Sequence, residues 1–143
     1  IQAVVEAEGL GPHVLFAGRV SDADLHAWYE AATVFVHPSR YEGSSLVTLE
    51  AMAHRRAIIA TRAGGLPDKV RPGVNGWLVD VDSVDGLTRA IEEAADARGS
   101  LQAMGAASRR IVEEEFSWTV LVESYLTAYA ALSARSALQP DGR

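Results

Sequence analysis

Two glutamates, Glu42 and Glu50, have the residue type and the spacing to take part in a binding site. Glu42 lies in a loop after Pro38 and Ser39, and Glu50 lies within the helix that is expected to start near Ser45. At about 1.5 Å per helical residue, Glu50 is roughly 7 to 8 Å beyond the start of that helix. The two carboxylates are therefore not a catalytic pair by spacing alone, but they can stand on either side of a ligand.

The loop between the two glutamates favours an anion. In an open parallel sheet, ligands bind at the carboxyl ends of the strands, where the next helix presents unpaired N–H groups and a partial positive charge. Gly43 lets the backbone approach a ligand closely, and Ser44 and Ser45 can either cap the helix or donate to a phosphate. A diphosphate bound there would leave one carboxylate on each side, where each could accept hydrogen bonds from sugar or ribose hydroxyls.

A plainer interpretation stays open, in which Glu42 is a solvated loop charge and Glu50 is a helix residue that faces water. The neighbours of Glu50 argue against it, because Leu49, Ala51 and Met52 leave the helix with almost no polar face. We expect Glu50 to be drawn away from bulk water, and a buried carboxylate needs a hydrogen-bonding partner. A ligand hydroxyl is the partner that this pattern predicts.

The composition indicates one folded domain and excludes several function classes. The 143 residues are 48% hydrophobic and carry a formal charge of −6, which leaves no polybasic face for nucleic acid. Without cysteine there is no disulfide or thiolate metal site, and the histidines lack metal-ligand spacing, so no metal is expected. No apolar run reaches the roughly 20 residues that cross a bilayer. The chain has no signal-peptide pattern and starts without Met, which indicates a piece of a longer protein that is cytoplasmic or peripheral at the inner face of a membrane.

Short apolar segments alternate with helical patterns, which predicts an α/β fold with a parallel sheet and crossover helices. One partial domain is expected over residues 1–136, followed by a frayed tail over residues 137–143. The expected strands cover residues 14–18, 33–37, 57–61 and 76–80. The first expected helix ends near residue 10, and the second follows Ser21, which forms a capping pattern with Asp24. A third helix is expected to start near Leu46, and a short helical piece is expected near Asp68. Three further helices are expected over residues 84–97, 100–115 and 117–136.

Five short motifs follow one another in a recognisable order. The patterns PS-x-x-EG and EAMA surround Glu42 and Glu50, and they are followed by Ala60-Thr61, Gly64-Gly65 and Asn75-Gly76 before an apolar strand. Residues 14–79 thereby resemble the C-terminal domain of retaining glycosyltransferases of the GT-B type, glycosyltransferase family 4. The E-x7-E motif of that family has the spacing of Glu42 and Glu50.

The resemblance implies a Rossmann-like domain that binds a nucleotide-diphosphate sugar donor, from which a sugar passes to an acceptor with retention and without metal or other cofactor. Glu42 would be the catalytic residue that meets hydroxyls of the donor sugar, and Glu50 would hold the ribose. The sugar and the diphosphate would lie against the residues around the helix start, which are Gly43, Ser44, Ser45, Leu46, Val47 and Thr48. The base would rest on the segment that contains Arg19, Val20 and Asp22.

Two differences from the family pattern bear on function. Ser44 and Ser45 stand where the family has an aromatic residue and a second glycine, which leaves the identity of the donor open. The family's first two strands, the arginine and lysine between them, and its acceptor-binding N-terminal domain would all precede Ile1. By resemblance, those two strands would lie between the segments 14–18 and 33–37, so we expect a gap in the sheet and activity only within a longer chain.

Other functions remain as alternatives to the donor-binding part of a hexosyltransferase. One is a non-catalytic nucleotide-sugar-binding remnant or module, and another is a GT-B enzyme of different chemistry, such as an epimerase or a phosphorolytic enzyme. The last helix also has two interpretations: its apolar stripe packs on the sheet, or it crosses to the N-terminal domain, which is favoured. That stripe consists of Leu121, Val122, Tyr125, Tyr129 and Leu132.

Overall fold

The centre of the molecule is a three-stranded parallel sheet, in a computed structural model that describes residues 1–137 and the side chains up to residue 133. The sheet has the order β1-β2-β3, with β1 at Val34–His37, β2 at Ala57–Thr61 and β3 at Gly76–Val79. All five residues of β2 are buried, as expected for a central strand of a sheet covered on both faces. The α/β prediction is confirmed, and the carboxyl ends of all three strands lie at one edge.

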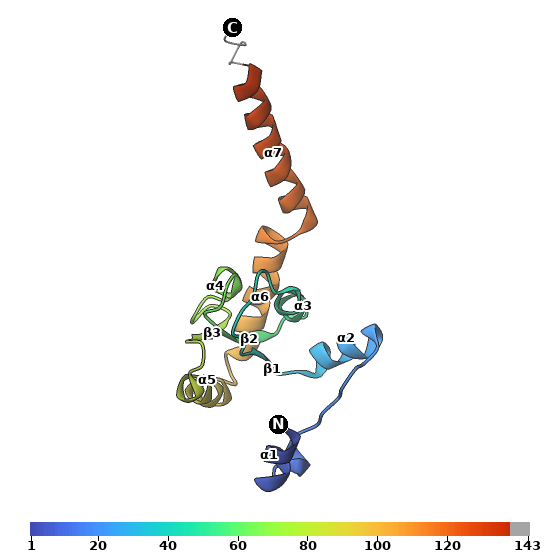
Figure 1. Ribbon diagram of the computed structural model, residues 1–143, viewed down its shortest axis with the longest axis vertical. Helices are drawn as coiled ribbons and strands as arrows, with labels where there is room; N and C mark the ends of the chain where they lie inside the picture. Colours follow the sequence, from blue (N-terminus) through green and yellow to red (C-terminus); the bar gives the residue numbers. More distant parts are fainter. Residues whose placement is uncertain (138–143) are drawn as a thin grey trace.

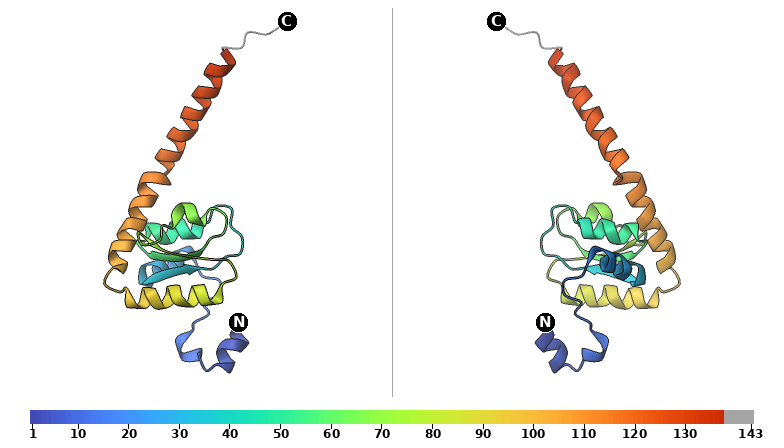
Figure 2. Two further views of the ribbon diagram at one scale, coloured as in Figure 1. Left: turned by 90° about the vertical axis from the view of Figure 1, so that its left-hand side faces the viewer. Right: turned by 90° about the vertical axis from the view of Figure 1, so that its right-hand side faces the viewer.

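Helices cover both faces of this sheet (Figures 1 and 2). On one face lie α3 (Leu46–Ala53) and α4 (Leu66–Lys69), and on the other lies α5 (Val84–Asp96). α6 (Leu101–Glu115) packs against α3 and β2. The remaining elements are α1 (Gln2–Ala7), the 3-10 turn η1 (Gly11–His13), α2 (Asp22–Ala31) and α7 (Trp118–Ala137).

The alternating side chains of β2 build two cores. Ile58 and Ala60 pack with Met52 of α3 and Leu66 of α4, whereas Ile59 packs with alanines of α5 on the opposite face. This alternation follows from the two-residue period of a strand. The face that carries α3 is the face on which the candidate site is built.

Local capping signals place the helix starts where the sequence predicts them. The Asp24 amide donates to Ser21 Oγ at 3.2 Å, and the Ser21 hydroxyl donates to Asp24 Oδ2 at 2.7 Å, so Ser21 caps α2 and the Asp24 carboxylate orients its hydroxyl. At α5, the Gly86 amide donates to Ser83 Oγ at 3.1 Å. These side chains satisfy N–H groups that have no partner within the helix.

The predicted strand over residues 14–18 does not form. The segment runs from η1 to α2 without strand pairing, and Val14, Leu15 and Phe16 are 38%, 73% and 44% exposed. A strand needs a neighbour for its N–H and C=O groups, and among the described residues none lies beside this segment. This agrees with the expected gap between residues 14–18 and β1.

α7 extends away from the sheet (Figures 1 and 2). Its apolar residues are exposed, among them Tyr125 at 66% and Leu132 at 60%, and it packs against α6. Packing of this stripe on the sheet of the same chain is therefore wrong. Ala137 still belongs to α7, while residues 138–143 of the predicted tail lie outside the described residues. Within residues 1–137, no helix combines the length and the apolar character needed to cross a membrane.

Candidate functional site

The site begins where β1 ends and the chain turns toward α3. Pro38 stops the strand, and the Thr61 hydroxyl at the end of β2 donates to the Ser39 carbonyl at 2.5 Å. At the other end of the loop, the Thr48 amide donates to Ser45 Oγ at 3.4 Å, and the two side-chain oxygens are 2.9 Å apart. Ser45 is therefore the N-cap of α3, one of the two roles that its position allowed.

The first turn of α3 lies at the surface even though the helix is apolar. Leu46 is 68% and Val47 39% exposed, whereas Thr48, Ala51 and Met52 are buried. Gly43 and Ser44 are exposed as well. The helix thus anchors its far half in the core and presents its positive end to solvent at the carboxyl edge of the sheet.

Glu42 is held by a histidine that sequence reasoning did not connect to it. His37 Nε2 lies 2.7 Å from Glu42 Oε1, and the two side chains are 22% and 24% exposed. His37 is the last residue of β1, so its ring stands at the carboxyl edge beside the loop. The position of a histidine at the end of a predicted strand, five residues before Glu42, is the signal that could have found this contact.

Glu50 is exposed rather than buried, so the expectation that it is drawn away from water was wrong. Its side of α3 faces α2, where the Tyr29 hydroxyl donates to Glu50 Oε2 at 2.9 Å. Tyr29 itself is 5% exposed, and burial together with the hydrogen bond to Glu50 raises its pKa to about 12. One oxygen of the Glu50 carboxylate therefore has its hydrogen-bonding partner within the protein, which is Tyr29.

Aromatic rings connect the partners of the two carboxylates. Phe35 of β1 lies between Tyr29 and His37, with ring centroids 5.8 Å from the first and 5.9 Å from the second. Phe35 and His37 point to the same face of the sheet because they are two residues apart on one strand. Glu42 and Glu50 are therefore fixed from the same face, beside the start of α3.

The turn at Gly64 and Gly65 presses directly against the loop that contains Glu42. The Gly65 amide donates to the Gly43 carbonyl at 3.1 Å. At Gly64, where φ is +48°, an added Cβ would lie 1.4 Å from the Glu42 carbonyl oxygen. Only glycine fits this contact, so this turn determines where the Glu42 backbone lies.

Lys69 is a residue of the site that sequence reasoning missed. It is 2% exposed, and its Nζ donates to Ser44 Oγ at 3.1 Å and to the Gly65 carbonyl at 3.2 Å. Burial lowers the pKa of its ammonium group, against the opposing effects of Asp68 and Glu42. Lys69 is the single lysine in a chain whose other cations are arginines, which is the one sequence signal that set it apart.

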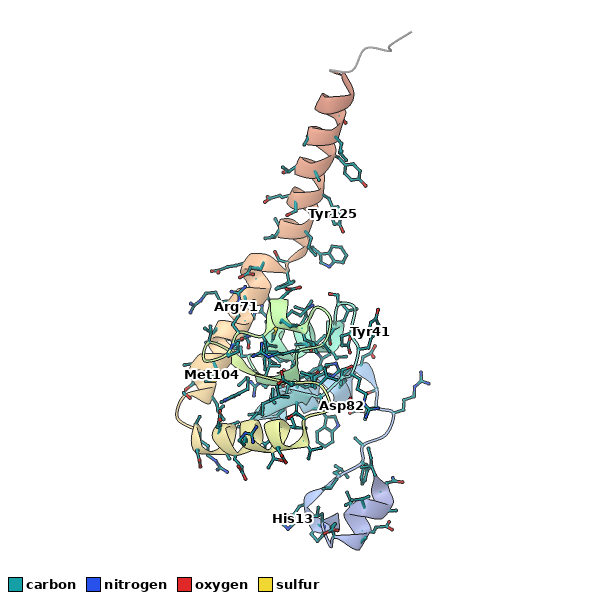
Figure 3. All side chains as sticks on the ribbon, turned by 60° about the vertical axis from the view of Figure 1, so that its left-hand side comes forward. His13, Tyr41, Arg71, Asp82, Met104 and Tyr125 are labelled. Atoms are coloured by element: carbon teal, nitrogen blue, oxygen red, sulfur yellow. The ribbon has the colours of Figure 1, made fainter. Side chains whose placement is uncertain are left out.

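The predicted base-binding segment is not brought to the loop of Glu42. Arg19, Val20 and Asp22 precede or begin α2, whose start lies away from the sheet in Figure 1. No hydrogen bond within residues 1–133 joins them to residues 42–50. Arg40, in the loop before Glu42, has its Nε 2.6 Å from Asp82 Oδ1, and Figure 3 shows Tyr41 and Asp82 on the same side of the molecule.

A large recess of the described residues lies elsewhere. Its volume is about 850 Å³, and it opens on the opposite face of the sheet, against β1, β2 and α5, with Val34, Ile59 and Ile91 among its walls. It holds neither of the two glutamates. Among the described residues, no cluster of acidic or histidine side chains has the arrangement of a metal site.

A parallel sheet with helices on both faces and an exposed helix start at its carboxyl edge is the arrangement of a Rossmann-like α/β domain. The comparisons with known proteins name its family. The sequence model of the family "Glycosyl transferases group 1" matches residues 1–97, so this chain belongs to that family. Its fold is that of the C-terminal domain of GT-B glycosyltransferases, as in LpcC from Francisella tularensis, whose C-terminal domain superimposes with a TM-score of 0.74 at 27% identity over 82% of this chain and 60% of that one.

Several relatives are more similar in sequence. An alpha-maltose-1-phosphate synthase from Mycobacterium tuberculosis is 37% identical over 81% of this chain and 32% of its own length. Sucrose-phosphate synthase from Thermosynechococcus elongatus has a TM-score of 0.81 at 32% identity, over 94% of this chain and 34% of that one. The chain thus spans about a third of the length of the curated relatives that it matches first.

Proposed function

We propose that this chain is the donor-binding part of a retaining hexosyltransferase that uses a nucleotide-diphosphate sugar. The observation that carries the proposal is the placement of Glu42 and Glu50 around the exposed start of α3, each fixed from the same face of the sheet. The names of relatives agree with such a donor. A mannosyltransferase from Mycobacterium tuberculosis, 37% identical over 79% of this chain, is described as GDP-mannose-dependent. HepE from Anabaena, which shares the fold, was crystallised with UDP and with UDP-glucose.

Each residue has a role in this proposal. The diphosphate rests against the amides of Ser44, Ser45 and Leu46, with Val47 and Thr48 completing the first turn of α3, where the helix end stabilises negative charge. Glu42 accepts hydrogen bonds from hydroxyls of the donor sugar, and Glu50 accepts them from the ribose. The base rests on Arg19, Val20 and Asp22, which requires α2 to begin nearer the sheet than it does in this structure.

The chemistry that follows is mainly electrostatic. When the sugar leaves, negative charge grows on the diphosphate, and donors already aimed at that position lower the barrier to transfer. Binding also orients the donor relative to the acceptor, whose site belongs to the N-terminal domain of such enzymes. Transfer with retention is therefore a property of the complete protein, in which this chain supplies the donor site.

The ribose role of Glu50 is tested in the complete protein by titration calorimetry with UDP and GDP. Glu50→Ala is expected to weaken binding of the preferred nucleotide about tenfold, because a carboxylate accepting from two hydroxyls is lost. Glu92→Ala on α5, an exposed glutamate remote from the site, is the control for charge. Tyr29→Phe removes the hydrogen bond to Glu50 and keeps its carboxylate, so an equal loss in this variant would show that Glu50 acts only by holding α2.

The role of Glu42 separates a transferase from a binding module. Glu42→Ala is expected to lower the rate of sugar transfer by about two orders of magnitude while changing the affinity for bare UDP or GDP by less than about threefold, because its partners are on the sugar. The donor is first chosen by thermal shift against a panel of nucleotide sugars. Equal losses in transfer and in nucleotide binding would contradict the assignment, and donor binding without any transfer would identify the non-catalytic module.

A further inference from the structure

Lys69 carries a buried ammonium group that makes no direct ion pair within residues 1–133, although the carboxylates of Asp68 and Glu42 act on it from a longer distance. Its side chain is 2% exposed. Two neutral oxygens, Ser44 Oγ and the Gly65 carbonyl, accept from its Nζ. A charge taken out of water is costly unless it is paired, so the structure keeps this ammonium group beside the start of α3 at the expense of stability.

The surroundings of Lys69 hold its ammonium group in place. The Asn75 side chain bonds the backbone on both sides, donating to the Lys69 carbonyl at 3.0 Å and accepting from the Arg71 amide at 2.7 Å. The ring of Phe116, which follows α6, lies with its centroid 5.5 Å from Nζ, within the range of a cation–π interaction. The lysine side chain therefore points to the loop of Glu42 and Ser44 and not to solvent.

The direction of the hydrogen bond between Lys69 and Ser44 determines what Ser44 can do. An ammonium group only donates, so Ser44 Oγ is the acceptor and its own hydroxyl hydrogen must point elsewhere. Within residues 1–133 no acceptor takes that hydrogen, and Ser44 is exposed. The Ser44 hydroxyl is thus left as a hydrogen-bond donor in the exposed loop before α3, next to a buried cation.

We propose that Lys69 is a positioning residue that makes Ser44 a donor to a phosphate oxygen of the nucleotide-diphosphate sugar, with the buried charge strengthening that hydrogen bond. The inference rests on the proposed donor site and adds to it a lysine that cannot reach the ligand itself. A hydrogen bond polarised by a charged neighbour is stronger than one between neutral groups. The charge of Lys69, which is buried under the loop, thereby strengthens the hydrogen bond from Ser44 to the diphosphate.

The test is a double-mutant cycle in the complete protein with Lys69→Met, Ser44→Ala and the double variant. Affinity is measured for whichever of UDP and GDP the wild type binds. Each single variant is expected to bind about tenfold more weakly, and the double variant also about tenfold more weakly, because Lys69 acts only through the Ser44 hydroxyl, which the double variant already lacks. Arg62→Met, which removes a half-exposed cation paired with Asp80, is the matched control and should leave the affinity unchanged.

Two further measurements distinguish a role in ligand binding from a role in folding. The affinity for the nucleoside without phosphates, uridine or guanosine, should be the same in all variants. The thermal midpoint of Lys69→Met should be equal to or above that of the wild type, because methionine fills a buried site without a charge. If Lys69→Met does not fold, Ser44→Ala at the surface still gives the comparison between nucleoside and nucleotide.

Several outcomes would overturn this inference while leaving the donor site standing. The first is that Lys69→Met binds the nucleotide with wild-type affinity, and the second is that the two losses multiply to about a hundredfold in the double variant. The third is that the variants lose affinity for the nucleoside as much as for the nucleotide. The fourth is that the variants lose affinity for UDP-glucose but not for UDP, which would place Ser44 on the sugar. A wild-type protein that binds neither UDP nor GDP would instead refute the proposed function itself.

Discussion

Each carboxylate of the site has one oxygen engaged by an aromatic side chain. Oε1 of Glu42 lies against His37, and Oε2 of Glu50 accepts from Tyr29. Among the described residues, the second oxygen of each carboxylate has no hydrogen bond within the protein and is available to a ligand hydroxyl. At the residue scale, the protein thus fixes the orientation of both groups without using up their capacity to accept.

The Tyr29–Glu50 contact predicts a pH effect on stability. Because the pKa of Tyr29 is raised from 10.0 to about 12, the folded state holds this proton more tightly than the unfolded chain. Its contribution is complete below pH 10 and is lost as the pH rises toward 12, which removes up to about 3 kcal/mol of the unfolding free energy at about 1.4 kcal/mol per pKa unit. Urea unfolding across this range should show the loss in the wild type and not in Tyr29→Phe.

The two ends of α3 have different environments, since its second half packs in the core and its first turn is exposed. The capping by Ser45 is compatible with both, because it orders the first turn without covering it. The Gly64–Gly65 turn then fixes the preceding loop against α4. At the scale of elements, the candidate site is the start of α3, which is ordered by the Ser45 cap and by the contact of the preceding loop with the Gly64–Gly65 turn.

Ser45→Ala is expected to lower both the unfolding free energy, by about 1 kcal/mol, and the affinity for UDP or GDP, by several-fold, because the first turn of α3 loses its cap. Ser83→Ala removes the equivalent cap of α5 at a distance from the site and is the matched control. It should cost similar stability in chemical unfolding and leave calorimetric affinity intact. Equal affinities in the two variants would argue against an anion at the start of α3.

At the scale of the molecule, two exposed apolar regions stand out. One is the segment 14–18, which should be a strand by its sequence, and the other is the stripe of α7, from which Tyr125 projects in Figure 3. Both are the kind of surface that a neighbouring part of a protein covers. For α7 this leaves crossing to an N-terminal domain as the remaining prediction.

Residues 1–143 expressed alone should therefore bind a dye for apolar surface, such as ANS, several-fold more strongly than the complete protein does at equal molar concentration. Replacing Leu15 and Phe16 by serine should lower the dye signal of the short chain, since these side chains are 73% and 44% exposed. An equal signal from the two proteins would mean that these regions are also exposed in the complete protein.

The sequence determined the local elements and the spacing of the acidic residues. It predicted β2 over residues 57–61 to the residue and the starts of α2 and α3, because caps, proline and apolar periodicity act within a few neighbours. Tertiary structure decided the contacts of the site. Tyr29 lies 21 residues from Glu50, and Lys69 lies 25 residues from Ser44, so no local pattern joins them. The strand predicted over residues 14–18 was wrong for the same reason, since a strand exists only where another strand supplies hydrogen bonds.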